Sequence, residues 1–158
     1  MNTVTAILKQ ALAHEAKGTA IYEKAAEITT HDDSRMLFLE LAQMEDGHAT
    51  QLIEQAAKSF KDINAAELKK FVDEEEGKPA PEAIVAEMAD GEMRDVLNAA
   101  LRFEKEAIDH YNNLLGAVES DDLKRLCQTL LKEEQGHVKQ IERTLMSLDM
   151  PDEERPDL

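Results

Sequence analysis

The sequence predicts an all-α fold, an antiparallel four-helix bundle with a long crossover connection between its second and third helices. The composition is the first observation behind this prediction: Ala, Leu, Glu, Lys, Met and Gln dominate, whereas the 158 residues include only 4 Pro and 6 Gly. Such a mixture favours helix throughout. Four long segments also carry apolar residues spaced alternately three and four apart, the pattern of helices that pack one face in a bundle.

We expect the four long helices near residues 3–28, 34–60, 92–118 and 122–148. Apolar stripes run along each, through Leu8 in the first segment, Leu41 in the second, Leu97 in the third and Leu130 in the fourth. Residues 29–34 and the pair Asp121-Asp122 should form two tight turns. Asp and Ser side chains in the first turn can accept hydrogen bonds from unpaired backbone N–H groups at a helix start.

The sequence of residues 61–90 differs from that of the long segments, because it predicts short elements and not one long helix. We expect short helices near 64–72 and 81–89, separated by a solvated loop that begins with the acidic run Asp73–Glu76. A 27-residue helix is about 40 Å long, and about 30 residues of loop and short helix can cross that distance. The connector can thus return the chain to the other end of the bundle. Residues 1–148 should form one bundle domain, and the acidic, proline-containing tail 149–158 should be disordered.

The chain also repeats itself at an offset of 89 residues. The motif Glu45-Asp46-Gly47-His48 returns as Glu134-Gln135-Gly136-His137, and residues 7–54 align with 96–143. Two helix pairs of one ancestral design are therefore expected. A glycine costs about 1 kcal/mol in a helix interior, so for Gly47 and Gly136 we expect a packing reason, such as a close helix approach or room for a ligand. Identical pairs include Leu8/Leu97, Leu12/Leu101, Glu15/Glu104, Tyr22/Tyr111 and Gln51/Gln140.

Six polar residues interrupt the apolar stripes. A Glu and a His three apart on a helix share one face. Glu15 and Glu45 each lie about 15 residues from the first tight turn and hence at the same depth, and Glu104 and Glu134 repeat this about the second turn. Four carboxylates and two imidazoles should therefore point at one layer of the core: Glu15, Glu45, His48, Glu104, Glu134 and His137.

Four buried carboxylates need compensating charge, because isolated buried ions cost several kcal/mol each. Two divalent cations would neutralise them, so we predict that the six residues bind two divalent metal ions. In the alternative, the glutamates only edge the core and extend into solvent. Carboxylate and imidazole ligands suit iron, manganese and zinc alike, so the residues leave the metal open.

Other chemically distinctive residues have two interpretations each. Tyr22 and Tyr111 lie two turns beyond Glu15 and Glu104, where they either hydrogen-bond to ligand carboxylates or fill the core. Glu106 should face solvent, since it lies about 200° around the helix from Glu104. Cys127 is expected to be a small core residue. Three histidines fall off the apolar stripes and are expected at the surface: His14, His31 and His110.

The ligand pattern resembles that of ferritin-like diiron carboxylate proteins, and most of all their rubrerythrin branch, over residues 3–148. The matching motif is Glu15, then Glu45-x-x-His48, then Glu104, then Glu134-x-x-His137. The resemblance implies two iron ions, with terminal carboxylates at Glu15 and Glu104 and bridging carboxylates at Glu45 and Glu134. It also implies His48 and His137 as one nitrogen ligand per metal.

Two departures from the rubrerythrin pattern bear on the reaction. Rubrerythrins usually carry a C-terminal rubredoxin module with four iron-binding cysteines, whereas this sequence has a single Cys127. An external electron donor, such as a rubredoxin-like protein, is therefore expected. Rubrerythrins also tend to have an extra Glu one turn from the third helix's ligand, and here Leu101 and Ala107 hold the neighbouring positions. The redox-linked ligand exchange of that Glu is not expected here.

The resemblance implies an oxidoreductase that reduces hydrogen peroxide or dioxygen. The alternatives are ferrous oxidation and storage in a many-subunit cage, and a non-catalytic metal-stabilised bundle. With 34 acidic against 18 basic residues, the net charge of −16 disfavours nucleic acid and anionic membranes as partners. The single cysteine fits a reducing compartment, and neither a signal peptide nor a membrane-length apolar run is evident. A cytoplasmic homodimer is expected.

Overall fold

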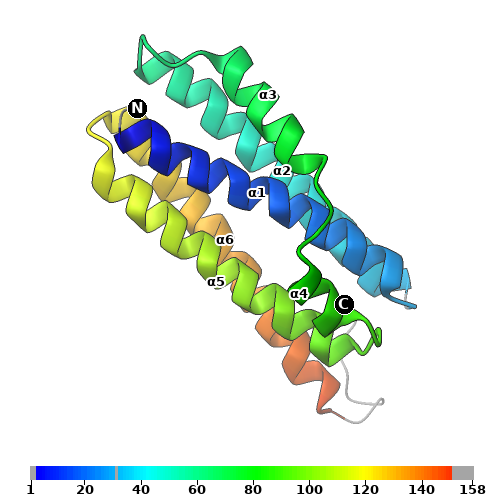
Figure 1. Ribbon diagram of the computed structural model, residues 1–158. Helices are drawn as coiled ribbons and strands as arrows, with labels where there is room; N and C mark the ends of the chain where they lie inside the picture. Colours follow the sequence, from blue (N-terminus) through cyan, green and yellow to red (C-terminus); the bar gives the residue numbers. More distant parts are fainter. Residues whose placement is uncertain (1–2, 31, 151–158) are drawn as a thin grey trace.

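The structure, a computed structural model, describes residues 3–30 and 32–150 and is helical throughout its regular elements (Figure 1). The described part of the chain contains no strand, which confirms the all-α prediction. The tail residues 151–158 and His31 lie outside the described residues. The helices are α1 (Thr3–Ile28), α2 (Asp32–Ser59), α3 (Ala65–Glu76), α4 (Glu82–Met88), α5 (Met93–Ala117) and α6 (Asp121–Leu148).

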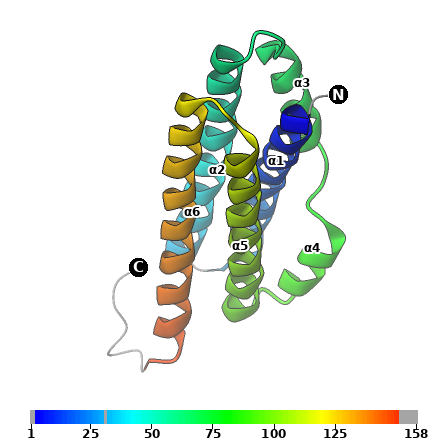
Figure 2. The same ribbon diagram turned by 90° about the vertical axis from the view of Figure 1, so that its left-hand side faces the viewer.

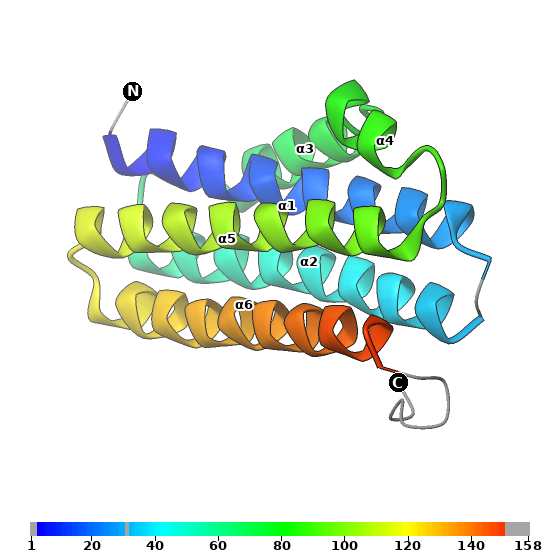
Figure 3. The same cartoon turned by 90° about the horizontal axis from the view of Figure 1, so that it is seen from below.

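The four long helices α1, α2, α5 and α6 lie side by side (Figure 3). Helix α1 packs chiefly on α2, and α5 chiefly on α6, while α1–α5 and α2–α6 contacts join the two pairs. The α1–α2 link and the α5–α6 link lie at opposite ends of the bundle (Figure 3). In the sequence, α3 and α4 lie between the two helix pairs, and in the structure they lie on the outside of the bundle. Helix α3 packs on α1 and α2, and α4 packs on α5 and α1 (Figure 2).

The apolar core consists of two clusters with a polar layer between them. One cluster contains Leu8, Leu52, Leu114 and Leu123, among other residues. The other contains Ile21, Phe38, Leu97 and Ile141, among others. On each long helix a buried glutamate lies between residues of the two clusters: Glu15, Glu45, Glu104 and Glu134. Burial of a large aliphatic side chain contributes about 1.5–3 kcal/mol, so the two clusters hold a costly polar layer in place.

Several boundaries differ from the expected ones; α2, for example, begins at Asp32, inside the expected turn 29–34. The acidic run Asp73–Glu76 is not a loop but the last turn of α3, which Leu68 and Val72 anchor to the core. Because the preceding turn is anchored by apolar contacts, the helix continues through the acidic residues. It ends at Gly77, whose N–H donates a hydrogen bond to the Asp73 carbonyl. Asp121 and Asp122 likewise belong to the first turn of α6, where acidic side chains interact favourably with the helix dipole.

The close helix approach expected at Gly47 and Gly136 is wrong, because a Cβ at either position would meet nothing within 4 Å. The close approach occurs at Gly18 instead. A Cβ there would lie 2.8 Å from Phe103 Cε1 and 3.1 Å from Glu45 Cγ. The internal repeat gave no indication that Gly18 is special, since the residue 89 places later is Ala107 and not a second glycine.

The lengths and apolar character of the helices also bear on membranes. Within the described residues, no helix combines the length and the hydrophobicity that a membrane crossing requires.

Candidate metal centre

The structure brings the six predicted ligand residues into one layer of the core. Helix α1 contributes Glu15, α2 contributes Glu45 and His48, α5 contributes Glu104, and α6 contributes Glu134 and His137. Their exposed fractions lie between 0 and 4%. The alternative in which the glutamates lie at the edge of the core and extend into solvent is therefore wrong. That they bind metal stays a prediction, which the geometry below supports.

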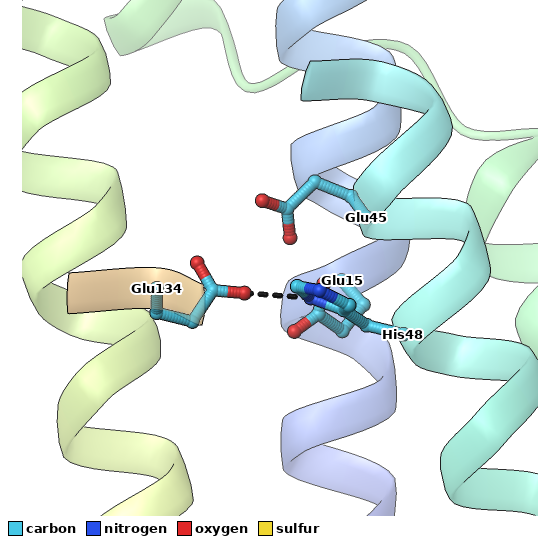
Figure 4. Close-up of side chains that lie close together, drawn as sticks. All are labelled: Glu15, Glu45, His48 and Glu134. Carbon is cyan, nitrogen blue, oxygen red and sulfur yellow. Dashed lines mark ion pairs between the residues drawn. The ribbon is translucent and has the colours of Figure 1, made fainter. Parts of the chain in front are cut away.

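The ligand atoms fall into two overlapping groups, within each of which all atoms lie within 4.8 Å of one another. We call the group of Glu15, Glu45, His48 and Glu134 the His48 half-site. The group of Glu45, Glu104, Glu134 and His137 is the His137 half-site. Glu45 and Glu134 belong to both, and they reach toward each other from facing helices (Figure 4). Each half-site thus has one glutamate and one histidine of its own and two shared carboxylates.

Both imidazole rings turn Nδ1 toward the carboxylates. His48 Nδ1 lies 2.8 Å from Glu134 Oε1 and 3.6 Å from Glu15 Oε2 (Figure 4). His137 Nδ1 lies 3.4 Å from Glu104 Oε1 and 3.7 Å from Glu45 Oε1. The two rings are nearly parallel, at an interplanar angle of 9° with centroids 5.9 Å apart. One nitrogen of each histidine is therefore placed to serve as a metal ligand.

The two tyrosines hydrogen-bond to glutamates of the opposite repeat. Tyr22 Oη donates to Glu104 Oε1 at 2.5 Å, and Tyr111 Oη donates to Glu15 Oε1. Each bond occupies one carboxylate oxygen and leaves the other, Oε2, without a hydrogen-bond partner. The tyrosines thus orient the two glutamates that the half-sites do not share.

The residues fit a pair of divalent cations. Within the described residues, most buried side-chain N and O atoms that lack a hydrogen bond belong to this layer. Oxygen and imidazole nitrogen donors suit iron, manganese or zinc, and cations would satisfy these atoms at once. The atoms are Glu15 Oε2, both oxygens of Glu45 and of Glu134, Glu104 Oε2, both ring nitrogens of His137, and His48 Nδ1, which is close to Glu134 but not aligned for a hydrogen bond.

The pKa values of the buried carboxylates shift in different directions. Burial raises the pKa of Glu45, and the charge of Glu15 adds to the rise. It also raises the pKa of Glu104 to about 7, and the nearby carboxylate of Glu134 adds to the rise. Burial alone would raise the pKa of Glu134, but the nearby side chains of Glu104, His137 and His48 hold it below its ordinary value.

The histidines respond to the same charges. Burial lowers the pKa of an imidazole, but the neighbouring carboxylates of Glu134 and Glu15 raise the pKa of His48 to about 11. Glu104 and Glu134 likewise raise the pKa of His137 to about 9 against the effect of burial. Without metal, this layer therefore holds protons, and metal must displace them in order to bind.

Sequence reasoning missed Glu133, a neighbour of the site. Its Oε2 lies 2.6 Å from His48 Nε2, the ring nitrogen that faces away from the carboxylates of the half-sites. The Glu133 side chain is 40% exposed. Glu133 lies off the apolar stripe of α6, so periodicity gives no signal for it. Only the adjacency of α2 and α6 brings it to His48.

The expectation for His14 is wrong, because the structure buries this residue. Its ring stacks on Phe103, with centroids 3.9 Å apart and an angle of 8° between the planes, and its Nε2–H donates to the Phe103 carbonyl. Burial lowers its pKa to about 4. The α1–α5 contact thus covers a face that periodicity assigned to solvent. His110 is half-buried beside it, while Glu106 is exposed and Cys127 is buried, as predicted.

Comparison with known proteins agrees with this geometry. A sequence model of the family described as Rubrerythrin matches residues 6–145, a range that contains all six candidate ligands. No curated protein matches the sequence. Because the family match covers most of the chain and both half-sites, this protein belongs to the rubrerythrin family.

Proposed function

We propose that this protein is a diiron oxidoreductase that reduces hydrogen peroxide or dioxygen with electrons from an external donor, such as a rubredoxin-like protein. One observation carries the proposal: two half-sites share two buried carboxylates and each adds its own glutamate and histidine. Such a set of ligands suits a pair of metal ions that take part in one reaction together. The proposed reaction needs a metal that changes its oxidation state, which zinc does not, and we propose iron over manganese because the resemblance to diiron proteins implies it.

The ligands would divide as the half-sites do. Glu45 and Glu134 would contact both metals, Glu15 and His48 one of them, and Glu104 and His137 the other. When bound, two iron ions supply the electrons that reduce the substrate, as each passes from the ferrous to the ferric state. Reduction of hydrogen peroxide to two water molecules consumes two electrons and two protons, so one reduced pair suffices for one molecule.

The chain's own residues prepare the site. Tyr22 and Tyr111 hold Glu104 and Glu15 in fixed orientations. The apolar clusters on both sides of the layer exclude bulk water, which strengthens electrostatic interactions inside it. After each turnover the external donor returns two electrons.

The proposal extends to the chain path and the setting of the protein. We propose the ferritin-like path, an antiparallel four-helix bundle with residues 61–90 as the crossover, which the placement of α3 and α4 along the bundle supports (Figure 1). We also propose a homodimer in the cytoplasm. The single cysteine supports a reducing compartment.

The test is anaerobic loading with ferrous iron followed by hydrogen peroxide. Loss of peroxide together with the absorbance of ferric iron is expected, and reduction by a rubredoxin-like donor should restore the ferrous state over many cycles. The double variant Glu45→Ala with Glu134→Ala is the control and should consume no peroxide above free iron. Loaded protein that leaves peroxide unchanged would refute the proposal, and a native mass of many subunits would favour iron storage.

A further inference from the structure

Glu133 engages the outer nitrogen of one histidine ligand. Its carboxylate lies 2.6 Å from His48 Nε2, while Nδ1 of the same ring faces Glu134, one of the shared carboxylates. A carboxylate can only accept a hydrogen bond from the ring, so it favours the tautomer with the proton on Nε2. The lone pair on Nδ1 is then free for a metal.

The same arrangement is missing on the other side of the site. The residue 89 places before Glu133 is Met44, so the first repeat has a thioether where the second repeat has a carboxylate. No residue that the structure describes forms a hydrogen bond with either ring nitrogen of His137. The tyrosine–glutamate bonds of the two halves do correspond, as Tyr22 with Glu104 and Tyr111 with Glu15 show. The asymmetry is therefore local to the histidines.

We infer that Glu133 is a positioning residue that makes the His48 half-site bind divalent metal more tightly than the His137 half-site. A carboxylate on the outer nitrogen fixes the ring orientation and tautomer and strengthens the ring as a donor, and its loss costs about 10–100-fold in metal affinity. The two ions of the pair are thus unequal: one is held firmly and the other is the first to leave. This inference rests on the dinuclear site of the proposed function but not on its reaction.

Glu133 acts through His48 and not as a ligand itself. Within the described residues, its carboxylate belongs to neither group of atoms close enough to hold a metal. Its side chain is 40% exposed, so it keeps part of its hydration and adds little of the desolvation penalty that a buried carboxylate carries.

Titration of the metal-free protein with Zn²⁺ against a competing chelator tests the inference, because zinc is redox-silent. Wild type should take up two ions with unequal dissociation constants. Glu133→Ala should weaken the tighter step by about 10–100-fold and leave the other in place. Glu133→Gln keeps an acceptor without the charge and should lose less.

The internal repeat offers a gain-of-function variant. Met44→Glu gives His137 the partner that His48 has, and it should tighten the weaker step, while the size-matched Met44→Gln should do so less. In ¹⁵N-labelled zinc-loaded protein, the His48 Nε2–H signal should be shifted downfield and protected from exchange, and Glu133→Ala should abolish that protection. If Glu133 had only a structural role, Glu133→Ala would leave the His48 tautomer unchanged and would not weaken one zinc-binding step while sparing the other.

Each result has a definite meaning. Equal affinities in wild type, or a Glu133→Ala variant that weakens neither step or both alike, overturn the inference. If Glu133→Ala does not fold, Glu133→Gln and Met44→Glu decide the question. A wild type that binds no zinc would instead overturn the dinuclear site on which the proposed function stands, so the two failures are distinguishable.

Discussion

Tyr22 on α1 donates a hydrogen bond to Glu104 on α5, and the repeat returns the bond in the opposite direction, from Tyr111 on α5 to Glu15 on α1. These reciprocal bonds link the two helix pairs through the polar layer itself. Each tyrosine thus serves the glutamate of the opposite repeat, although a glutamate of its own helix lies two turns away.

We expect Tyr22→Phe and Tyr111→Phe each to destabilise the metal-free protein by about 1–3 kcal/mol, because each leaves a buried carboxylate oxygen without its donor. For a domain of this size, that loss lowers the melting temperature by roughly 2–4 °C per kcal/mol. Thermal unfolding by circular dichroism measures it. Unchanged melting in both variants would show that the hydroxyls do not stabilise the layer.

Metal stoichiometry should depend on whether a carboxylate is shared. Protein purified without chelator should contain about two metal ions per chain. Glu45→Ala removes a ligand from both half-sites and should lower both affinities, whereas Glu15→Ala should affect the His48 half-site alone. Metal analysis after gel filtration distinguishes these cases. Exposed Glu106→Ala is the control and should keep the wild-type content; a loss equal to that of Glu45→Ala would contradict the assignment.

The metal-free protein should lose stability as pH rises. Burial raises the pKa of Glu104 from 4.5 to about 7, and neighbouring carboxylates raise that of His137 from 6.5 to about 9. In both cases the folded state binds the proton more tightly than the unfolded chain does. The stabilisation is full below the unfolded pKa and is lost as pH passes the folded pKa. The free energy of unfolding should therefore fall between pH 4.5 and 9.

Denaturant midpoints measured across this range test the pH prediction. Glu104→Gln should flatten the portion between pH 4.5 and 7. Burial and the neighbouring Asp46 also raise the pKa of Glu76 to about 7, so Glu76→Gln is the matched variant that removes a titration outside the site. The metal-loaded protein should show little loss, because metal replaces the protons. An identical slope with and without metal would assign the loss to surface repulsion.

The glycines should respond oppositely to alanine. Gly47→Ala and Gly136→Ala should each stabilise the protein by up to about 1 kcal/mol, the helix-propensity difference, since the added Cβ meets nothing. Gly18→Ala gains the same propensity but forces Phe103, which is stacked on His14, to move. Overpacking typically costs about 1–3 kcal/mol. Unfolding midpoints should therefore rise in the first two variants and not in the third; a clear rise in Gly18→Ala would contradict this.

The long helices and the inward direction of Glu15, Glu45, Glu104 and Glu134 could be predicted from the sequence. The reason is that 3.6-residue periodicity determines which side chains share a face, and distance from a turn determines depth along a helix. Glu106 illustrates the same rule, because its angle from Glu104 placed it correctly in solvent. The repeat at offset 89 added the correspondence between the two helix pairs.

Contacts between helices required the tertiary structure. Periodicity describes one helix at a time, and it does not specify how far each helix is rotated against its neighbours. Packing of α1 on α5 buries His14 and brings Gly18 against Phe103, and packing of α2 on α6 brings Glu133 to His48. The residues at the candidate metal centre were thus determined by local pattern, whereas their hydrogen-bond partners were decided by the mutual rotation of packed helices.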